Sequence, residues 1–168
     1  MGAFTYPRSE PGSSGHMDLV EHLNGNTPAL RAELAGLSDE AVSRRPSEEE
    51  WSLKENCAHL CDSAKFLHRR LSMMIQLEDP RLKAWDQEEE LRSRDLGAVS
   101  IQDLLAEFAA QRGETVDMLA ELVHWNWART GRHEEHGRLS IRQLVDRALA
   151  HEEGHLDQIR ALKAAAGA

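Results

Sequence analysis

The 168-residue chain lacks several features that mark common functional classes. Its two cysteines, Cys57 and Cys61, cannot build a disulfide scaffold, and four residues apart on one helix they would not bridge easily. No apolar run approaches the roughly 20 residues that a membrane-spanning helix needs. The first residues lack the apolar stretch of a signal peptide, and we find no Ser-His-Asp order, phosphate loop or dinucleotide fingerprint. These absences predict a cytoplasmic protein in a reducing compartment.

Positive charge is also scarce. The chain has 20 lysines and arginines against 29 aspartates and glutamates, which gives a formal net charge of −9. A surface that negative repels phosphate backbones and anionic membrane surfaces. We therefore expect neither nucleic acid nor a membrane as a partner.

The hydrophobic pattern predicts one all-α domain. Strand-like alternation is absent, and prolines and most glycines fall between segments or near their ends. Four amphipathic stretches of this length pack most simply as a four-helix bundle. They run from about Asp18 to Gly36, from Ser52 to about Leu77, from Ser100 to about His124 and from Ser140 to about Ala166.

The ends of these stretches carry further signals. Ser52 with Glu55, and Ser140 with Gln143, have the spacing of capping boxes that begin the second and fourth helices. Residues 1–16 are expected to be a poorly packed leader, either a tag remnant or a native tail, and residues 17–166 to form the bundle domain.

The chain contains nine histidines, a high count for its length, and two of them share one helix face. His151 and His155 are separated by about 40° around the fourth helix, so both rings project among its apolar residues. A buried imidazole without a partner is destabilising. Coordination to one metal ion would satisfy both rings. The alternative is two histidines at the edge of the core, bonded to backbone or water.

A third ligand must come from another element, and His59 is the best candidate. It lies about 125° from the centre of the second helix's apolar stripe, on a flank that would still face a site between two helices. Glu152 falls inside the apolar stripe of the fourth helix. It could be a ligand, a hydrogen-bond acceptor for an imidazole, or a salt-bridge partner, and we expect the second role. Glu152 and Asp62 are also the candidates for a general base.

The remaining unusual side chains have plainer explanations. Cys57 and Cys61 point away from His59 on their helix, so we expect them to pack in the core rather than bind metal. The four tryptophans are expected to be core or pocket-wall residues. The other histidines are expected at the surface, with lining of a pocket as the alternative for His133 and His136.

Two segments resemble the DinB/YfiT-like family. Residues 51–62, WSLKENCAHLCD, are similar to its W-[ST]-x-x-E-x-x-x-H-L-x-D segment, and GRLSI at 137–141 followed by HEEGHLDQI at 151–159 looks like its last helix. The resemblance implies an up-down-down-up four-helix bundle, often a homodimer. It also implies a divalent metal, nickel or zinc, on His59, His151 and His155. Many members have a further histidine where this chain has Gly154.

Family members are described as metal-dependent hydrolases, and relatives use low-molecular-weight thiols, as in bacillithiol transferases and mycothiol-dependent isomerases. The resemblance therefore implies a metal-dependent enzyme of the hydrolase or thiol S-transferase type, acting on a small molecule. Three imidazoles leave an ion with an open position, as in a catalytic site. The alternatives are a non-catalytic, dimeric, stress-related binding bundle with a structural metal, and a bundle without metal.

Overall fold

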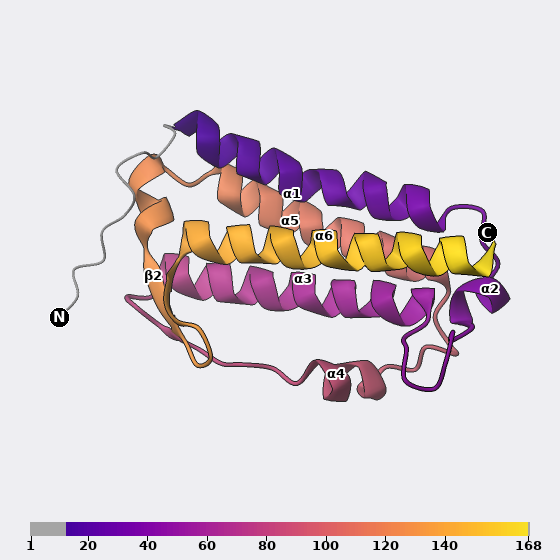
Figure 1. Ribbon diagram of the computed structural model, residues 1–168. Coiled ribbons are helices and arrows are strands. Elements are labelled where there is room, and N and C mark those ends of the chain that lie inside the picture. The colour runs from indigo at the N-terminus through magenta and orange to yellow at the C-terminus, as the bar shows by residue number, and fades with distance from the viewer. Residues whose placement is uncertain (1–12, 168) are drawn as a thin grey trace.

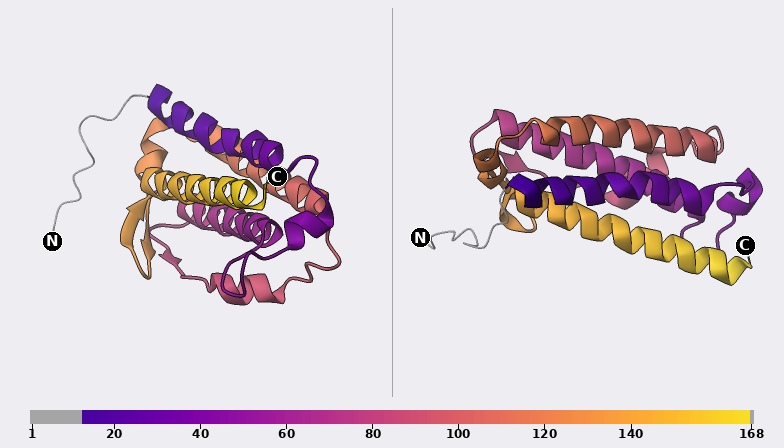
Figure 2. Two further views of the ribbon diagram at one scale, coloured as in Figure 1. Left: turned by 45° about the vertical axis from the view of Figure 1, so that its right-hand side comes forward. Right: turned by 90° about the horizontal axis from the view of Figure 1, so that it is seen from above.

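The computed structural model describes residues 13–167, and four long helices make up its bundle (Figure 1). Figures 1 and 2 show two helices running in one direction and the two between them in sequence running in the other. The predicted all-α, up-down-down-up bundle is thereby confirmed. The helices are α1 (Ser13–Leu34), α3 (Leu53–Gln76), α5 (Ile101–Ala120) and α6 (Ile141–Ala166).

Each long helix packs against two others, so the four form a closed ring. α1 contacts α5 and α6, and α3 contacts the same two helices. Buried leucines from all four helices fill the space between them. Cys57 and Cys61 lie in this core as expected, and the Cys61 thiol donates a hydrogen bond to the carbonyl oxygen of Leu104, 3.2 Å away.

The helix starts follow their capping residues. Both predicted capping boxes, at Ser52 and at Ser140, are present. A third, at Ser100, uses Asp103 in place of the usual Glu or Gln. α5 ends at Ala120, before the predicted His124, and a short 3₁₀ helix, η1 (His124–Ala128), follows it.

The first helix begins earlier than its sequence suggested. α1 starts at Ser13 rather than near Asp18, so the last residues assigned to the leader are helical. His16, which we placed at the surface, is only 2% exposed and stacks on Trp127 with 4.6 Å between ring centroids. The stacking of His16 on Trp127 of η1 thus stabilises the first turns of α1. The two residues are far apart in the chain, so local sequence cannot reveal the contact. Residues 1–12 of the predicted leader lie outside the described residues.

Three short strands accompany the helices, and the hydrophobic pattern did not indicate them. The short strands β1 (Arg81–Leu82), β2 (Thr130–His133) and β3 (Gly137–Ser140) form one sheet in that order, β1–β2 parallel and β2–β3 antiparallel. Strands of two to four residues are too short to show an alternating pattern. A Cβ at Gly131 would lie 2.9 Å from the Leu82 side chain, so glycine permits the β1–β2 contact.

Two short helices lie in the connections. α2 (Asp39–Ser43) sits between α1 and α3, where the sequence suggested a helical turn. α4 (Gln87–Ser93) contains the acidic run of the long segment between α3 and α5, and this segment passes along the outside of α3 (Figures 1 and 2). Within the part of the chain that is described, no helix combines the length and apolar character needed to cross a bilayer.

Candidate metal centre

Three imidazoles converge where α3 packs against α6. The Nε2 atoms of His59 and His151 are 3.2 Å apart, and the His155 ring lies 4.6 Å, centroid to centroid, from each of the other two. Each ring offers one nitrogen within 4.8 Å of the others. Two nitrogens bound to one tetrahedral zinc ion at 2.0–2.1 Å would be about 3.4 Å apart. The three side chains therefore have the spacing of a ligand set.

The charge state of these rings suits a cation. Burial, followed by the neighbouring imidazoles, lowers the pKa of His59 to about 3. Burial and His151 lower the pKa of His155 to about 4. The pKa of His151 is lowered by desolvation as well, although its ring is at the exposed edge of the cluster. All three rings are therefore neutral at pH 7, and each has a nitrogen lone pair available for a metal ion.

Asn56 fixes the orientation of the His155 ring. Its side-chain N–H donates to the carbonyl oxygen of Ser52 at 3.0 Å, which leaves its Oδ1 facing His155 Nδ1 at 3.1 Å. An oxygen at that distance accepts the Nδ1 proton, so the neutral ring keeps its lone pair on Nε2. A hydrogen bond of this kind on the distal nitrogen is the usual support for a metal-ligating histidine.

His59 is held mainly by aromatic contacts. Its side chain is 0% exposed, and its ring lies 5.0 Å from Trp51 and 5.6 Å from Trp85, with which it stacks. Its Nδ1 is buried and has no hydrogen-bond partner in the structure, while its Nε2 faces His151 and lies 3.5 Å from the hydroxyl of Ser63. The two facing Nε2 atoms can share only one proton between them, whereas an ion between them would bind both lone pairs. The donor set therefore fits a divalent metal.

Glu152 is not part of this cluster. It is buried on another face of α6, where its carboxylate pairs with the guanidinium of Arg112 and accepts a hydrogen bond from the Asn26 amide at 2.9 Å. Burial raises the pKa of Glu152, and Arg112 and Asn26 oppose that shift. The expected hydrogen bond to an imidazole is thus replaced by a salt bridge, which was one of the three alternatives. The helical wheel showed that Glu152 points inward but could not show which helix it would meet.

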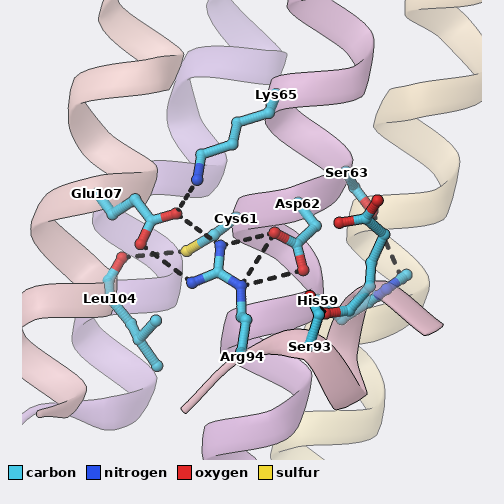
Figure 3. Close-up of polar contacts among 10 residues, drawn as sticks. His59, Cys61, Asp62, Ser63, Lys65, Ser93, Arg94, Leu104 and Glu107 are labelled. Atoms are coloured by element: carbon cyan, nitrogen blue, oxygen red, sulfur yellow. Dashed lines mark hydrogen bonds and ion pairs between the residues drawn. The ribbon is translucent and has the colours of Figure 1, made fainter. Parts of the chain in front are cut away.

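Asp62 is likewise engaged elsewhere (Figure 3). The Nε and Nη2 atoms of Arg94 donate to its two oxygens at 2.6–3.1 Å. The same guanidinium donates to Glu107, which also pairs with Lys65 at 2.6 Å. We call these four residues, Asp62, Lys65, Arg94 and Glu107, the Arg94 clamp. It fastens the segment after α4 to α3 and α5, and it directs the Asp62 carboxylate to Arg94, with no hydrogen bond to a histidine among the described residues.

A cleft of about 430 Å³ opens beside the histidines. His151 and Ser63 belong to its wall, so the exposed edge of the cluster faces this space. Phe66 and Trp85, stacked at 4.4 Å, form an aromatic part of the wall. His133 and His136 line the cleft as well, which was the alternative that the sequence left open for them.

His133, His136 and Glu135 form a second group whose ligand atoms lie within 4.8 Å of one another. His136 and Glu135 are exposed, and His133 Nδ1 already accepts the backbone N–H of Glu135 at 3.2 Å. This group is therefore a less complete donor set than the three histidines of α3 and α6.

Sequence reasoning missed one residue of the site, Asn56. Asn56 had a readable signal, because it is a polar side chain three residues after Leu53 and four before Leu60, within the apolar stripe of α3. Trp85 lines the cleft, as expected for a pocket-wall tryptophan, but its contact with His59 depends on the path of an irregular segment across α3.

Comparisons with known proteins agree with this architecture. The solved structure of YfiT from Bacillus subtilis, described as a probable metal-dependent hydrolase with an unusual four-helix bundle topology, superposes with a TM-score of 0.86 at 16% identity, over 97% of this chain and 94% of that one. TT2238, a four-helix bundle protein, gives 0.65 at 20% identity over 87% and 98% of the two chains. The two TM-scores show a shared fold, and at such low identities they show the fold alone.

Two relatives are detected from sequence. YuaE of Bacillus subtilis (strain 168), an uncharacterized protein, is 27% identical over 143 residues, which are 78% of this chain and 88% of YuaE. The protein named "Putative metal-dependent hydrolase OB0413", from Oceanobacillus iheyensis, is 24% identical over 143 residues, 85% of this chain and 82% of its own. The sequence model of the DinB superfamily matches residues 22–159, which include all three histidines, and the chain therefore belongs to the DinB superfamily.

Proposed function

We propose that this protein is a metal-dependent hydrolase of small molecules, with His59, His151 and His155 as the metal ligands. The observation that carries the proposal is the convergence of three neutral imidazoles whose exposed side adjoins a cleft. A closed structural site would use four protein ligands, whereas three leave a position for substrate. The description of YfiT and the name of OB0413 support the same activity.

A divalent ion in this position supplies Lewis-acid chemistry, because it polarises a substrate oxygen and makes water or a thiol a stronger nucleophile at neutral pH. The protein's own residues prepare the site. Asn56 keeps the proton of His155 on Nδ1, and Trp51 and Trp85 shield the His59 ring from water. Asp62 and Glu152 are held by arginines, so neither carboxylate is free to accept a proton from substrate.

Three imidazoles suit zinc and nickel, the two ions that the sequence resemblance implies. Thiol S-transfer uses the same open position and stays the alternative reaction. The homodimer, the cytoplasmic location and the absence of nucleic-acid partners stay predictions from the sequence.

The proposal is tested with protein stripped by a chelator and reloaded with Zn²⁺ or Ni²⁺. Elemental analysis is paired with a panel of small esters and amides, and with a second panel that combines small thiols and electrophiles. We expect about one ion per chain and turnover that depends on it. His155→Ala should lose both, and His22→Ala, on the exposed face of α1, should keep both.

Equal metal content in the wild type and His155→Ala would contradict the proposed ligands. Turnover confined to the thiol panel would replace hydrolysis by S-transfer. Metal binding that raises the melting temperature without turnover in either panel would make the metal structural.

A further inference from the structure

The cleft beside the histidines carries positive charge in a chain whose net charge is −9. Arg70 of α3 and Arg147 of α6 both line it, together with His133 and His136. Both guanidinium charges act on His133. Burial is the main cause that lowers the pKa of His133, and Arg70 and Arg147 lower it further. Glu135, which is exposed and does not line the cleft, is the acidic group that acts on both Arg70 and His133.

The two arginines have unused hydrogen-bonding capacity. Among the described residues, Arg147 forms no hydrogen bond or ion pair, and it is exposed to the cleft. Arg70 donates through Nη2 to the carbonyl oxygen of Lys83 at 2.6 Å, but its Nε is buried without a partner. By contrast, the guanidinium of Arg94 is bonded to carboxylates through all three nitrogens.

His133 adds a neutral donor to this end of the cleft. Its Nδ1 accepts the backbone N–H of Glu135, so its proton lies on Nε2. Burial and the nearby cations lower its pKa and keep the ring neutral at pH 7. Two guanidinium groups and an imidazole N–H together match the acceptor pattern of a carboxylate or phosphate group.

The spacing of these groups along α3 and α6 indicates how far a bound molecule would extend from the histidines. Arg147 precedes His151 by four residues on α6, about 6 Å along the helix axis, and Arg70 follows Ser63 by seven residues on α3, about 10 Å. The stacked rings of Phe66 and Trp85 lie in the cleft wall that includes these residues. A molecule bound along the cleft would therefore contact His151, the aromatic wall and the two arginines at once.

We propose that the cleft binds small anionic substrates, with the reacting group at the three histidines and a carboxylate or phosphate group at Arg70 and Arg147. This inference rests on the proposed function for its account of the reacting end. The anion subsite itself consists of residues that do not bind the metal. It can therefore be tested on metal-free protein.

The test compares three ligands with the same phenyl group and four-carbon chain by isothermal titration calorimetry: 4-phenylbutanoate, 4-phenylbutyl phosphate and the neutral 4-phenylbutan-1-ol. Each is titrated into the metal-free and the zinc-loaded protein. We expect at least one of the two anions to bind about tenfold more tightly than the alcohol in both forms, because charge-assisted hydrogen bonds distinguish them. The phosphate and carboxylate arms show which anion the subsite prefers.

Arg147→Gln and the double variant Arg70→Gln/Arg147→Gln identify the subsite. Arg147 makes no bond that a glutamine would break, so the single variant tests the idea even if the double variant folds poorly. The single variant should reduce the preference for the anion at least threefold, and the double variant should abolish it. Arg31→Gln is the control for loss of one positive charge, since Arg31 is exposed on α1 and does not line the cleft.

Equal affinity of the wild type for the alcohol and both anions would overturn the proposal, as would an anion preference that survives in Arg147→Gln. Loss of the preference in Arg31→Gln to the same extent would also overturn it, because the effect would then be one of net charge. Metal content is measured in parallel. Failure to bind metal would refute the proposed function, and the titrations of metal-free protein would still decide whether the cleft prefers anions.

Discussion

Two polar clusters lie within one turn of each other on α3, and they are built in opposite ways. In the Arg94 clamp, two carboxylates and two cations neutralise one another, and every nitrogen of the Arg94 guanidinium donates to a carboxylate. In the histidine cluster, which begins three residues earlier at His59, no described side chain supplies a counter-charge, the Nε2 atoms of His59 and His151 face each other, and the buried Nδ1 of His59 has no partner. A satisfied cluster holds the structure together, whereas an unsatisfied one marks a place for a ligand.

The strongest test of this contrast is a pair of matched substitutions on α3. His59→Ala should weaken metal binding by more than about 100-fold, because a ligand is lost rather than a supporting residue. Asp62→Ala should leave metal affinity within about threefold and lower the stability by about 1–3 kcal/mol, because Arg94 loses a partner. Competition titration with a metal chelator and chemical denaturation separate the two effects. The contrast fails if Asp62→Ala loses the metal as well.

Asn56 links the histidine cluster to the helix start at Ser52. Asn56→Leu keeps the approximate volume but removes the acceptor of His155 Nδ1, so we expect metal affinity to fall about 10- to 100-fold. Asn56→Asp retains an acceptor and should recover much of the affinity. Titration with Zn²⁺ under a competing chelator measures both. If leucine and asparagine support equal affinity, Asn56 does not position the ring.

Lowering the pH should weaken the ion pairs of the Arg94 clamp before the apolar core unfolds. Hydrogen bonds from Arg94, then from Lys65, lower the pKa of Glu107 below its ordinary value of 4.5. A lowered folded-state pKa stabilises the protein above the unfolded pKa, and this contribution is lost as pH falls through the folded value. The wild type should therefore lose about 0.5–1 kcal/mol more stability below pH 4.5 than Glu107→Gln does. Denaturation at pH 3 and pH 6 checks this, and identical slopes in both proteins would refute it.

The smallest effect is expected at Lys65, whose side chain is 49% exposed. An ion pair so open to solvent contributes about 0.2–0.5 kcal/mol. Lys65→Gln should therefore change the melting temperature only slightly and leave metal affinity unaltered. Thermal unfolding at low and high salt is the measurement. A loss above about 1.5 kcal/mol would show that the clamp depends on Lys65 far more than its exposure implies.

The sequence alone determined those features that depend on neighbours along one helix. Capping boxes placed the starts of α3 and α6, apolar periodicity placed the four long helices, and the four-residue spacing put His151 and His155 on one face. Each follows from the geometry of 3.6 residues per turn and from backbone groups that lie within a few residues of their partners.

Only the tertiary structure decided which inward-facing polar groups meet. Glu152 and Asn56 both point into the bundle, yet Glu152 reaches Arg112 of α5 and Asn56 reaches His155 of α6. The path of the 78–98 segment brings Trp85 onto His59, and η1 gives His16 its buried partner. These contacts join residues far apart in the chain, and their choice depends on how each helix is rotated and which neighbour it meets, which no local spacing encodes.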